Sequence, residues 1–434
     1  MFISPMKNLA VNAAGHLTIG GVDCVDIAKE YGTPAYVLDE AAVRESMRMY
    51  RDTMEEAFGK GSMPYFASKA LSCKYVYRLA AEEGIGIDVV SPGEIATAHA
   101  AGFPLERAIF HGNNKTDADI RYALTLGVGR FAVDNMTELD ILDVIAGEMG
   151  KKVKIQLRIT PGIDPHTHKA VVTGNIASKF GSAIATGQAM EIVRAAAEKA
   201  NLELVGLHCH IGSQIFDADP FIDAARIMIA FIADIKREVG VDIAELNLGG
   251  GYGVRYTNDD PEIDREALLR RVADEVKKLC AANNVAPPHI FMEPGRSIVA
   301  GAGITLYTVG SVKEITGFLN YVSIDGGMPD NPRYALYGSL YESYIANRAA
   351  EVRDYICTIA GRCCESGDLI AEDTKLQKPH RGEILAVAVT GAYNYAMASN
   401  YNRIPRPPIL VVKNGKVEVA VKRETYEDLY RLDV

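Results

Sequence analysis

The chain has 434 residues, of which 48% are hydrophobic, and its 46 Lys and Arg against 56 Asp and Glu give a formal net charge of −10. A chain of this size can bury a large core without disulfides, and its length suits one barrel of roughly 250 residues plus a smaller domain. The basic residues are scattered, so we expect neither nucleic acid nor an anionic membrane surface as a partner.

Segments that direct a protein out of the cytoplasm are not evident. The longest apolar run, Ile227 to Ala233, is far shorter than a membrane span, and the first residues lack a basic segment followed by an apolar one. The seven cysteines are odd in number, which favours reduced thiols over a disulfide framework. We therefore expect a cytoplasmic protein.

From about residue 40 to residue 300, short β-branched or aromatic runs alternate with helical patterns. The first 40 residues predict short strands at His16 to Ile19 and Ala35 to Leu38. Eight further strand candidates end at residues 69, 91, 111, 134, 158, 208, 247 and 293. Amphipathic segments such as Lys74 to Glu83 and Asp264 to Ala282 lie between them, and eight β-then-α units predict a TIM barrel.

All eight strand candidates carry a polar or charged residue at the carboxyl end. These residues are Lys69, Ser91, His111, Asp134, Arg158, His208, Asn247 and Glu293. A strand that merely emerges into water explains any one of them. Together they indicate an active site, because barrel enzymes place their sites at this face.

Beyond about residue 300 the pattern changes to strand-like runs without regular helices between them. The runs are Ile304 to Val309, Leu319 to Ile324, Asp354 to Ala360, Ile384 to Thr390, Ile409 to Val412 and Lys416 to Val421. They predict a mostly antiparallel β-barrel or sandwich domain. We expect residues 41–300 to form the barrel, and residues 1–40 and 301–434 to form a discontinuous β domain that contributes to the active site.

Lys69 ends the first barrel strand candidate, in Tyr-Phe-Ala-Ser-Lys-Ala. We expect the amine to be partly desolvated at the barrel mouth, which lowers a lysine pKa and suits Schiff-base chemistry with a carbonyl or with pyridoxal phosphate. An ordinary surface lysine is the alternative interpretation.

Two loops after the last barrel strands suit an anionic cofactor. Three consecutive glycines in Asn247-Leu-Gly-Gly-Gly-Tyr-Gly253 let backbone N–H groups approach a phosphate, although a tight turn also explains them. The dinucleotide spacing G-x-G-x-x-G fails, because Val254 and Tyr256 stand at its last position. Glu293-Pro-Gly-Arg-Ser297 follows the eighth strand, and loops after strands 7 and 8 often bind phosphate together. A carboxylate such as Glu293 can keep a pyridine nitrogen protonated.

The run His208-Cys-His-Ile-Gly-Ser-Gln214 ends the sixth strand candidate. Histidines at i and i+2 would share one strand face, so a zinc site is one interpretation, but further ligands at metal spacing are not evident. We favour stacking of the His210 imidazole on a flat cofactor, with Ser213 near its phosphate and no metal. His166 and His168 stand in a loop, where we expect structural or solvent-facing side chains.

Three polar, glycine-rich segments interrupt the second domain: Asp325 to Tyr337, Cys363 to Asp368 and Gly391 to Tyr395. Loops of this composition often carry site residues. Cys364 beside Glu365 suggests an acid pair for proton delivery, and a small buried thiol is the alternative.

Seven motifs, in chain order and over nearly the whole chain, resemble those of the diaminopimelate decarboxylase family. They are Phe66-Ala-Ser-Lys-Ala70, Arg158-Ile-Thr-Pro-Gly-Ile-Asp-Pro165, His208 to Gln214, Asn247 to Gly253, Glu293 to Arg296, Cys364 to Asp368 and Gly391 to Arg403. That family combines an alanine-racemase-like (β/α)8 barrel with a β domain and uses pyridoxal 5'-phosphate. The resemblance implies decarboxylation of meso-2,6-diaminopimelate at its D-centre to L-lysine and CO2, the last step of lysine biosynthesis.

The resemblance also implies individual roles. The catalytic residues it implies are Lys69, which forms the Schiff base, His210, which stacks on the ring, Glu293, which pairs with the ring nitrogen, and Cys364, which donates a proton. The cofactor-binding residues it implies are Lys69, Asp88, His210, Ser213, Gly250, Gly251, Glu293, Gly295, Arg296 and Tyr393. The substrate-binding residues it implies are Arg296, Arg333, Tyr337, Glu365 and Tyr393. In the family the positions of Cys364 and Glu365 enter from the second subunit, which implies a homodimer with shared active sites.

Other functions are also compatible with the sequence. A related decarboxylase acting on ornithine, arginine or carboxynorspermidine would call for an acidic residue in place of Arg333. An alanine racemase resembles the barrel but sets a basic residue against the ring nitrogen, where Glu293 stands here. A non-catalytic pyridoxal-phosphate-binding relative is a third alternative, against which Lys69, Glu293, Cys364 and Tyr393 all argue.

Overall fold

The computed structural model describes residues 2–163 and 178–434, so His166 and His168 lie outside the described residues. The chain forms two compact units. One, the barrel unit, comprises Met47–Gly253 and Ile263–Gly295; the other, the β unit, comprises Met1–Ser46, Val254–Glu262 and Arg296–Val434. The short segment Val254–Glu262 therefore belongs to the β unit although it lies within the segment expected to form the barrel.

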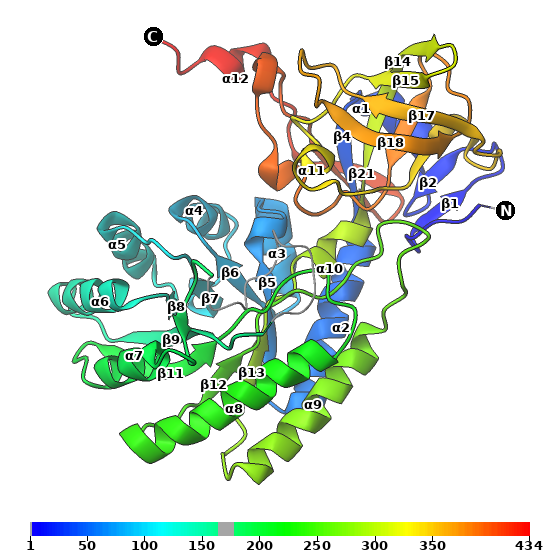
Figure 1. The fold of residues 1–434 in the computed structure, drawn as a ribbon. Helices are drawn as coiled ribbons and strands as arrows, with labels where there is room; N and C mark the ends of the chain where they lie inside the picture. Colours follow the sequence, from blue (N-terminus) through cyan, green and yellow to red (C-terminus); the bar gives the residue numbers. More distant parts are fainter. Residues whose placement is uncertain (1, 164–177) are drawn as a thin grey trace. The chain divides into compact units, whose positions relative to one another are not determined.

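The barrel unit is built on eight parallel strands that close on themselves, which confirms the predicted TIM-like fold (Figure 1). Each strand pairs with the next along the chain, and the last pairs with the first through Phe291 opposite Met63. The strands are β5 (Met63–Ala67), β6 (Gly86–Val89), β7 (Ala108–Phe110), β8 (Arg130–Val133), β9 (Val153–Thr160), β11 (Leu202–His208), β12 (Glu245–Asn247) and β13 (His289–Met292). The short strand β10 (Ser182–Ala183) also pairs with β9.

Helices lie around the outside of these strands (Figure 1). They are α3 (Lys74–Glu82), α4 (Pro92–Ala100), α5 (Asp117–Leu126), α6 (Met136–Glu148), α7 (Gln188–Ala197), α8 (Asp219–Val239) and α9 (Arg265–Ala282). Several begin at side chains that accept a hydrogen bond from the first turn, as Ser91 does for α4 and Asp264 for α9. The residue expected to end the second strand, Ser91, is thus the cap of the next helix.

The interior of the barrel contains both an apolar cluster and a chain of polar side chains. Tyr65, Ile109, Ala132 and Phe291 form a buried apolar cluster. A buried polar chain crosses the interior beside it: Arg130 pairs with Glu245, Gln156 Nε2 donates to Glu245 Oε2 at 2.8 Å, and Asn247 Nδ2 lies 3.5 Å from Gln156 Oε1. Because buried polar groups need partners, this chain fixes Asn247 at the end of β12.

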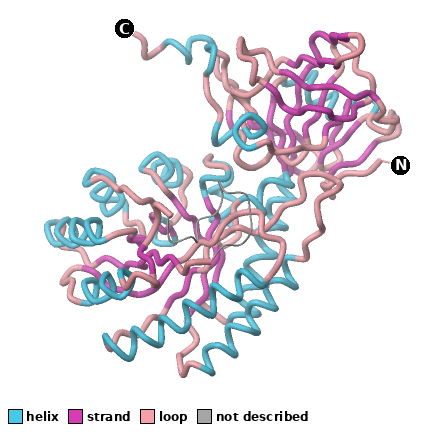
Figure 2. Tube along the Cα trace, in the orientation of Figure 1, coloured by secondary structure: helices cyan, strands magenta, loops and turns pink. Residues whose placement is uncertain are grey.

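The β unit is mostly antiparallel, as expected, and its strands stand out in Figure 2. Its strands are β1 (Leu9–Val11), β2 (Leu17–Ile19), β3 (Val22–Asp23), β4 (Ala35–Asp39), β14 (Gly303–Ile315), β15 (Leu319–Ile324), β16 (Ser343–Ile345), β17 (Tyr355–Ala360), β18 (Leu369–Leu376), β19 (Ile384–Val387), β20 (Ile409–Lys413) and β21 (Lys416–Val421). Two pairings, β15 with β17 and β20 with β4, are parallel. The long strand β14 pairs with β15, β19 and β4, and thereby joins the N-terminal strand β4 to the C-terminal part of the chain.

Helices in the β unit are few and mostly short: α1 (Cys24–Tyr31), α10 (Arg296–Val299), α11 (Arg333–Tyr337) and α12 (Tyr426–Tyr430). The 19-residue helix α2 (Glu40–Phe58) runs from the β unit into the barrel unit. Among the helices described, none is long and apolar enough to cross a membrane.

Candidate active site

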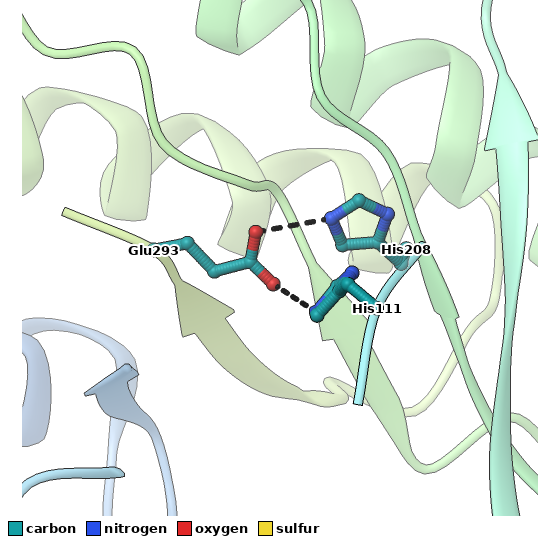
Figure 3. Close-up of side chains that lie close together, drawn as sticks. All are labelled: His111, His208 and Glu293. Atoms are coloured by element: carbon teal, nitrogen blue, oxygen red, sulfur yellow. Dashed lines mark hydrogen bonds and ion pairs between the residues drawn. The ribbon is translucent and has the colours of Figure 1, made fainter. Parts of the chain in front are cut away.

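The carboxyl ends of three barrel strands bring Glu293, His111 and His208 together (Figure 3). Glu293 follows β13, His111 follows β7 and His208 is the last residue of β11. Glu293 Oε1 accepts from Asn247 Nδ2 at 2.7 Å and lies 2.9 Å from His111 Nε2. Glu293 Oε2 lies 3.2 Å from His208 Nε2. The side chains of Glu293, His111 and His208 are all buried, so the carboxylate is held from several sides and away from bulk water.

The electrostatics of this group follow from burial and proximity. Burial alone raises the pKa of a carboxyl group, but the interactions with His111 and His208, hydrogen bonding from His208 among them, outweigh it and hold the pKa of Glu293 well below its usual value. Burial lowers the pKa of His208 to about 4, so its imidazole is neutral at ordinary pH. The site therefore holds a buried, ionised carboxylate beside a neutral imidazole.

His210 has a different role from His208, and the strand explains why. Because β11 ends at His208, the alternation of a strand does not continue to His210, and the two imidazoles do not form the zinc pair considered from the sequence. His210 Nδ1 instead accepts from the Gly250 N–H at 3.2 Å. Burial, with repulsion by Lys69 and Arg158, places the pKa of His210 well below its usual value, so a neutral, flat ring is fixed next to the glycine loop.

Lys69 lies on a 3₁₀ turn, η1 (Ser68–Ala70), just beyond the end of β5. Its side chain is exposed although Ser68 and Ala70 are buried. The residue is exposed because the strand stops at Ala67 and the turn carries Lys69 beyond it, and the expected partial desolvation of its amine stays a prediction. Asp88, on β6, is buried, and its Oδ1 has no hydrogen-bond partner among the described residues. Burial raises the pKa of Asp88, and attraction to His111 and Lys69 opposes that rise.

Close backbone packing accounts for three of the candidate glycines. A Cβ on Gly250 would lie 2.2 Å from the carbonyl oxygen of Glu293, and one on Gly251 would lie 2.3 Å from that of Gly212. A Cβ on Gly295 would lie 2.8 Å from the Cβ of Ala67. The glycines bring the loops after β11, β12 and β13 into contact, with the half-buried Ser213 on the first of these loops. The N–H of Gly250 is used by His210, so the loop does not present all its N–H groups to an anion.

In the β unit a second group of predicted residues comes together around two buried arginines. The Arg296 guanidinium lies 4.6 Å from the centre of the Tyr393 ring, and that of Arg333 lies 5.6 Å from the same ring and 5.4 Å from that of Tyr337. Arg333 Nε is buried without a hydrogen-bond partner among the described residues. Two buried cations surrounded by aromatic rings suit an anion such as a carboxylate or phosphate.

Two tyrosines of this arginine cluster were not singled out from the sequence. Tyr256 OH accepts from Arg296 Nη1 at 2.7 Å, and the Tyr256 ring lies 5.9 Å from the Arg333 guanidinium. Tyr341 packs edge-on against Tyr256 with ring centres 5.4 Å apart. Tyr256 was noted only as the residue that breaks a dinucleotide motif. Its place on the segment that joins the β unit, far from Arg333 in sequence, left no local signal of its function.

Cys364 and Glu365 are neighbours on an exposed loop between β17 and β18. The Cys364 N–H donates to Asn402 Oδ1 at 2.9 Å, and Tyr401 OH lies 3.5 Å from Glu365 Oε2. Asp368 accepts from the Cys363 N–H at 2.6 Å and shapes the turn that presents both residues. Cys364 is thus an exposed thiol and not the small buried one considered as its alternative.

Comparison with known proteins agrees with this geometry. The family model "Pyridoxal-dependent decarboxylase, pyridoxal binding domain" matches residues 41–300. Over 423 residues the chain is 46% identical to the diaminopimelate decarboxylase of Bacillus subtilis (strain 168), which covers 98% of this chain and 96% of that protein. The chain belongs to the diaminopimelate decarboxylase family. The same family is represented by the diaminopimelate decarboxylase of Staphylococcus aureus (strain COL), 42% identical over 96% of this chain and 97% of that protein.

Solved structures of the family share the fold of both units. The crystal structure of diaminopimelate decarboxylase from M. jannaschii in co-complex with L-lysine superimposes with a TM-score of 0.91 at 34% identity, covering 100% of this chain and 99% of that chain. Pyridoxal 5'-phosphate is the cofactor of this family.

The side chains of the barrel unit fit this cofactor. An ionised, buried carboxylate suits a protonated ring nitrogen, a fixed neutral imidazole suits the face of the ring, and an exposed lysine amine suits the aldehyde. Asp88 Oδ1, buried without a partner among the described residues, supplies a further polar atom.

Proposed function

We propose that this protein decarboxylates meso-2,6-diaminopimelate at its D-centre, releasing CO2 and L-lysine, as the last step of lysine biosynthesis. The observation that carries the cofactor assignment is the ionised Glu293 carboxylate held at the end of β13. The observation that carries the substrate assignment is the buried pair of arginines in the β unit. Membership of the family, at 46% identity over 98% of the chain, supports both.

The cofactor-binding residues divide the cofactor among them. Lys69 would hold the aldehyde carbon, Glu293 the ring nitrogen and His210 one face of the ring, and Asp88 would supply a further polar atom. Ser213, Gly250, Gly251 and Gly295 of the barrel unit would hold the phosphate, and for Arg296 and Tyr393 of the β unit the phosphate role rests on the family resemblance. When bound, pyridoxal 5'-phosphate supplies the electron sink that accepts the electron pair left as CO2 departs.

The β unit selects the substrate. Arg333, with Arg296, Tyr337 and Tyr393, binds the carboxylate that stays in the product. A substrate without that carboxylate leaves a buried guanidinium unpaired, which costs binding free energy, so lysine, ornithine and arginine are poor substrates. Recognition of this carboxylate separates the proposed activity from that of the related decarboxylases of basic amino acids.

The remaining two residues handle the proton and the distal amine. Cys364 Sγ donates the proton that replaces the lost carboxyl group, and the Glu365 carboxylate binds the distal ammonium. Both side chains are exposed on their loop, which supports the proposal that they serve the active site of a second subunit in a homodimer. We also propose that the protein works in the cytoplasm, where the substrate for lysine synthesis is found and where the seven cysteines stay reduced.

The test is a substrate panel with purified protein and added pyridoxal 5'-phosphate. Release of CO2 and lysine is measured with meso-diaminopimelate, L-lysine, L-ornithine, L-arginine and carboxynorspermidine offered one at a time. We expect equal amounts of CO2 and lysine from meso-diaminopimelate and at least a hundredfold less CO2 from the others, since two orders of magnitude are typical when buried polar groups lose their partner (about 3 kcal/mol). The control is Lys69→Ala, which cannot bind the cofactor covalently. Comparable turnover of any other substrate would overturn the assignment.

A further inference from the structure

His111 and His208 are not among the residues assigned to cofactor or substrate, yet they hold the carboxylate on which the proposed chemistry depends. His111 Nε2 lies 2.9 Å from Glu293 Oε1, and His208 Nε2 lies 3.2 Å from Oε2 (Figure 3). The side chains of both histidines are almost fully buried, with 4% and 1% of their surface exposed. Their rings contact each other edge-to-face with centres 4.8 Å apart, which limits rotation of either one.

The number of acceptor positions on the Glu293 carboxylate limits how many further donors it can bind. An ionised carboxylate has about four positions that accept hydrogen bonds, two on each oxygen. On Glu293, Asn247 donates a hydrogen bond to Oε1, where His111 Nε2 also lies at ion-pair distance without hydrogen-bond geometry, while His208 approaches Oε2. Because these two groups crowd Oε1, the contacts of the described residues leave one acceptor position, on Oε2, for one further donor. A protonated pyridine nitrogen is a single donor of that kind.

A histidine at position 208 also determines the charge beside the Glu293 carboxylate. Burial keeps His208 neutral, with its pKa lowered to about 4, and its Nδ1 has no partner among the described residues. This is the pattern of an imidazole that carries its proton on Nε2 and donates it to Glu293. A neutral donor satisfies and orients the carboxylate without cancelling its charge. A lysine or arginine in the same place would form an ion pair with Glu293 and weaken its attraction for a pyridinium.

We infer that His111 and His208 are positioning residues that keep Glu293 ionised and in one orientation, with one acceptor position of Oε2 reserved for the ring nitrogen of the cofactor. This inference rests on the proposed function, since it concerns how the same site tunes its cofactor. The residues act through Glu293, and they contact neither the substrate nor the reacting carbon in this account.

Other charged groups act on the same carboxylate and must be held constant in a test. Asp88 repels Glu293, whereas Arg158, on β9, attracts it. Lys69 faces Asp88 and His210 from the turn after β5. None of these groups is changed by a substitution at His111 or His208.

The test compares a variant that loses the donor with one that keeps an N–H at similar reach. His208→Leu removes the donor, and His208→Gln replaces it by an amide; His111→Leu and His111→Gln form the second pair. His16→Leu is the matched control, because His16 also pairs with a carboxylate, that of Asp23 at 2.8 Å, but in the β unit. Thermal unfolding of each apoprotein checks that the fold is retained.

Two measurements follow cofactor binding without relying on turnover. The first is the affinity of each apoprotein for pyridoxal 5'-phosphate and for the analogue in which carbon replaces the ring nitrogen. We expect His208→Leu to weaken binding of the natural cofactor about tenfold to a hundredfold, since it removes a hydrogen bond to a charged group, and to change binding of the carbon analogue less than threefold. His208→Gln recovers most of the loss, and His16→Leu binds both as the parent does.

The second measurement is ¹⁵N NMR of the ring nitrogen in cofactor labelled at that atom. We expect the nitrogen to stay protonated to a higher pH in the parent protein and in His208→Gln than in the two leucine variants. A purely structural role would lower the affinity for both cofactors equally and leave the titration of the nitrogen unchanged.

Three results decide against the inference. Equal weakening for the two cofactors, or an unchanged ring-nitrogen titration in both leucine variants, overturns it while leaving the proposed function intact. Stoichiometric zinc in the purified parent protein, lost in His208→Leu, overturns it in favour of a metal site at the same three side chains. Failure of the parent apoprotein to take up any pyridoxal 5'-phosphate overturns the proposed function first and this inference with it.

Discussion

Replacing Arg333 by methionine separates binding of the substrate from stability of the fold. Arg333 is buried in the β unit, where its Nη2 donates to Ser339 Oγ at 3.2 Å and three tyrosine rings surround the guanidinium. Nε lacks a partner among the described residues. The guanidinium is therefore incompletely compensated until an anion binds. Methionine keeps much of the apolar stem and removes the charge.

The two expected effects have opposite signs. Removing one partner of a buried charge pair costs about 2–5 kcal/mol, so kcat/KM for meso-diaminopimelate should fall about 30-fold to several thousand-fold. Stability should stay the same or rise, because replacing a buried charge by an apolar side chain of similar size removes its desolvation cost. The assays are initial rates of CO2 release and thermal unfolding of the same preparations.

The control is Arg226→Met, on the exposed face of α8, where the arginine forms an ion pair with exposed Asp223. Exposed ion pairs contribute little, so we expect both kcat/KM and the unfolding temperature to match the parent. A value of kcat/KM for Arg333→Met within threefold of the parent, or an unfolding temperature several degrees lower, would refute the reasoning about a buried cation that waits for a carboxylate.

Three further predictions concern packing, a buried ion pair and pH. Gly250→Ala should abolish uptake of pyridoxal 5'-phosphate, because the new Cβ would lie 2.2 Å from the Glu293 carbonyl oxygen, whereas Gly301→Ala, with nothing within 4 Å, should bind it normally; absorbance titration checks both. Lys115→Met should lower the free energy of unfolding by about 3–5 kcal/mol, because it leaves the buried carboxylate of Glu138 unpaired at a site where the two groups lie 2.7 Å apart. Adding Glu138→Leu should restore much of the loss in urea unfolding, and a double variant no more stable than the single one would contradict this. Burial raises the pKa of Glu94 to about 7, so the folded state holds a proton that the unfolded state releases, and stability should fall as pH rises from about 4.5 through 7. Glu94→Gln should flatten that slope in unfolding measured across this range, and an unchanged slope would count against the shifted pKa.

Much of the fold could be predicted from the sequence because its signals are local. Most barrel strands are short runs rich in apolar residues with a polar residue at or just after the end, and helical patterns lie between them. In the β domain, β15 and β21 begin and end at the expected residues, while β1, β3, β16 and β18 were missed. β16 has only three residues, and β18 mixes charged with apolar residues on a partly exposed strand, so neither has a clear apolar pattern.

The contacts within the sites were harder to predict because they join residues far apart in the chain. Both His111 and His208 were recognised at strand ends, but their convergence on Glu293 depends on the order and register of the closed barrel. Tyr256 reaches the arginine cluster only because its segment belongs to the β unit. The exposure of Lys69 depends on where β5 stops, and strand ends are among the least certain features of a sequence-based prediction.

The most direct test of the central claim uses two samples of meso-diaminopimelate, one labelled with ¹³C in the carboxyl group of the D-centre and the other in that of the L-centre. Each is given to the holoenzyme, and the label is measured in the released CO2 and in the lysine formed. We predict that the D-centre label leaves as CO2 and that the L-centre label remains in L-lysine. In each sample, CO2 and L-lysine should form in equal molar amounts. Label from the L-centre in CO2, or no CO2 from either sample with cofactor bound, would contradict the account.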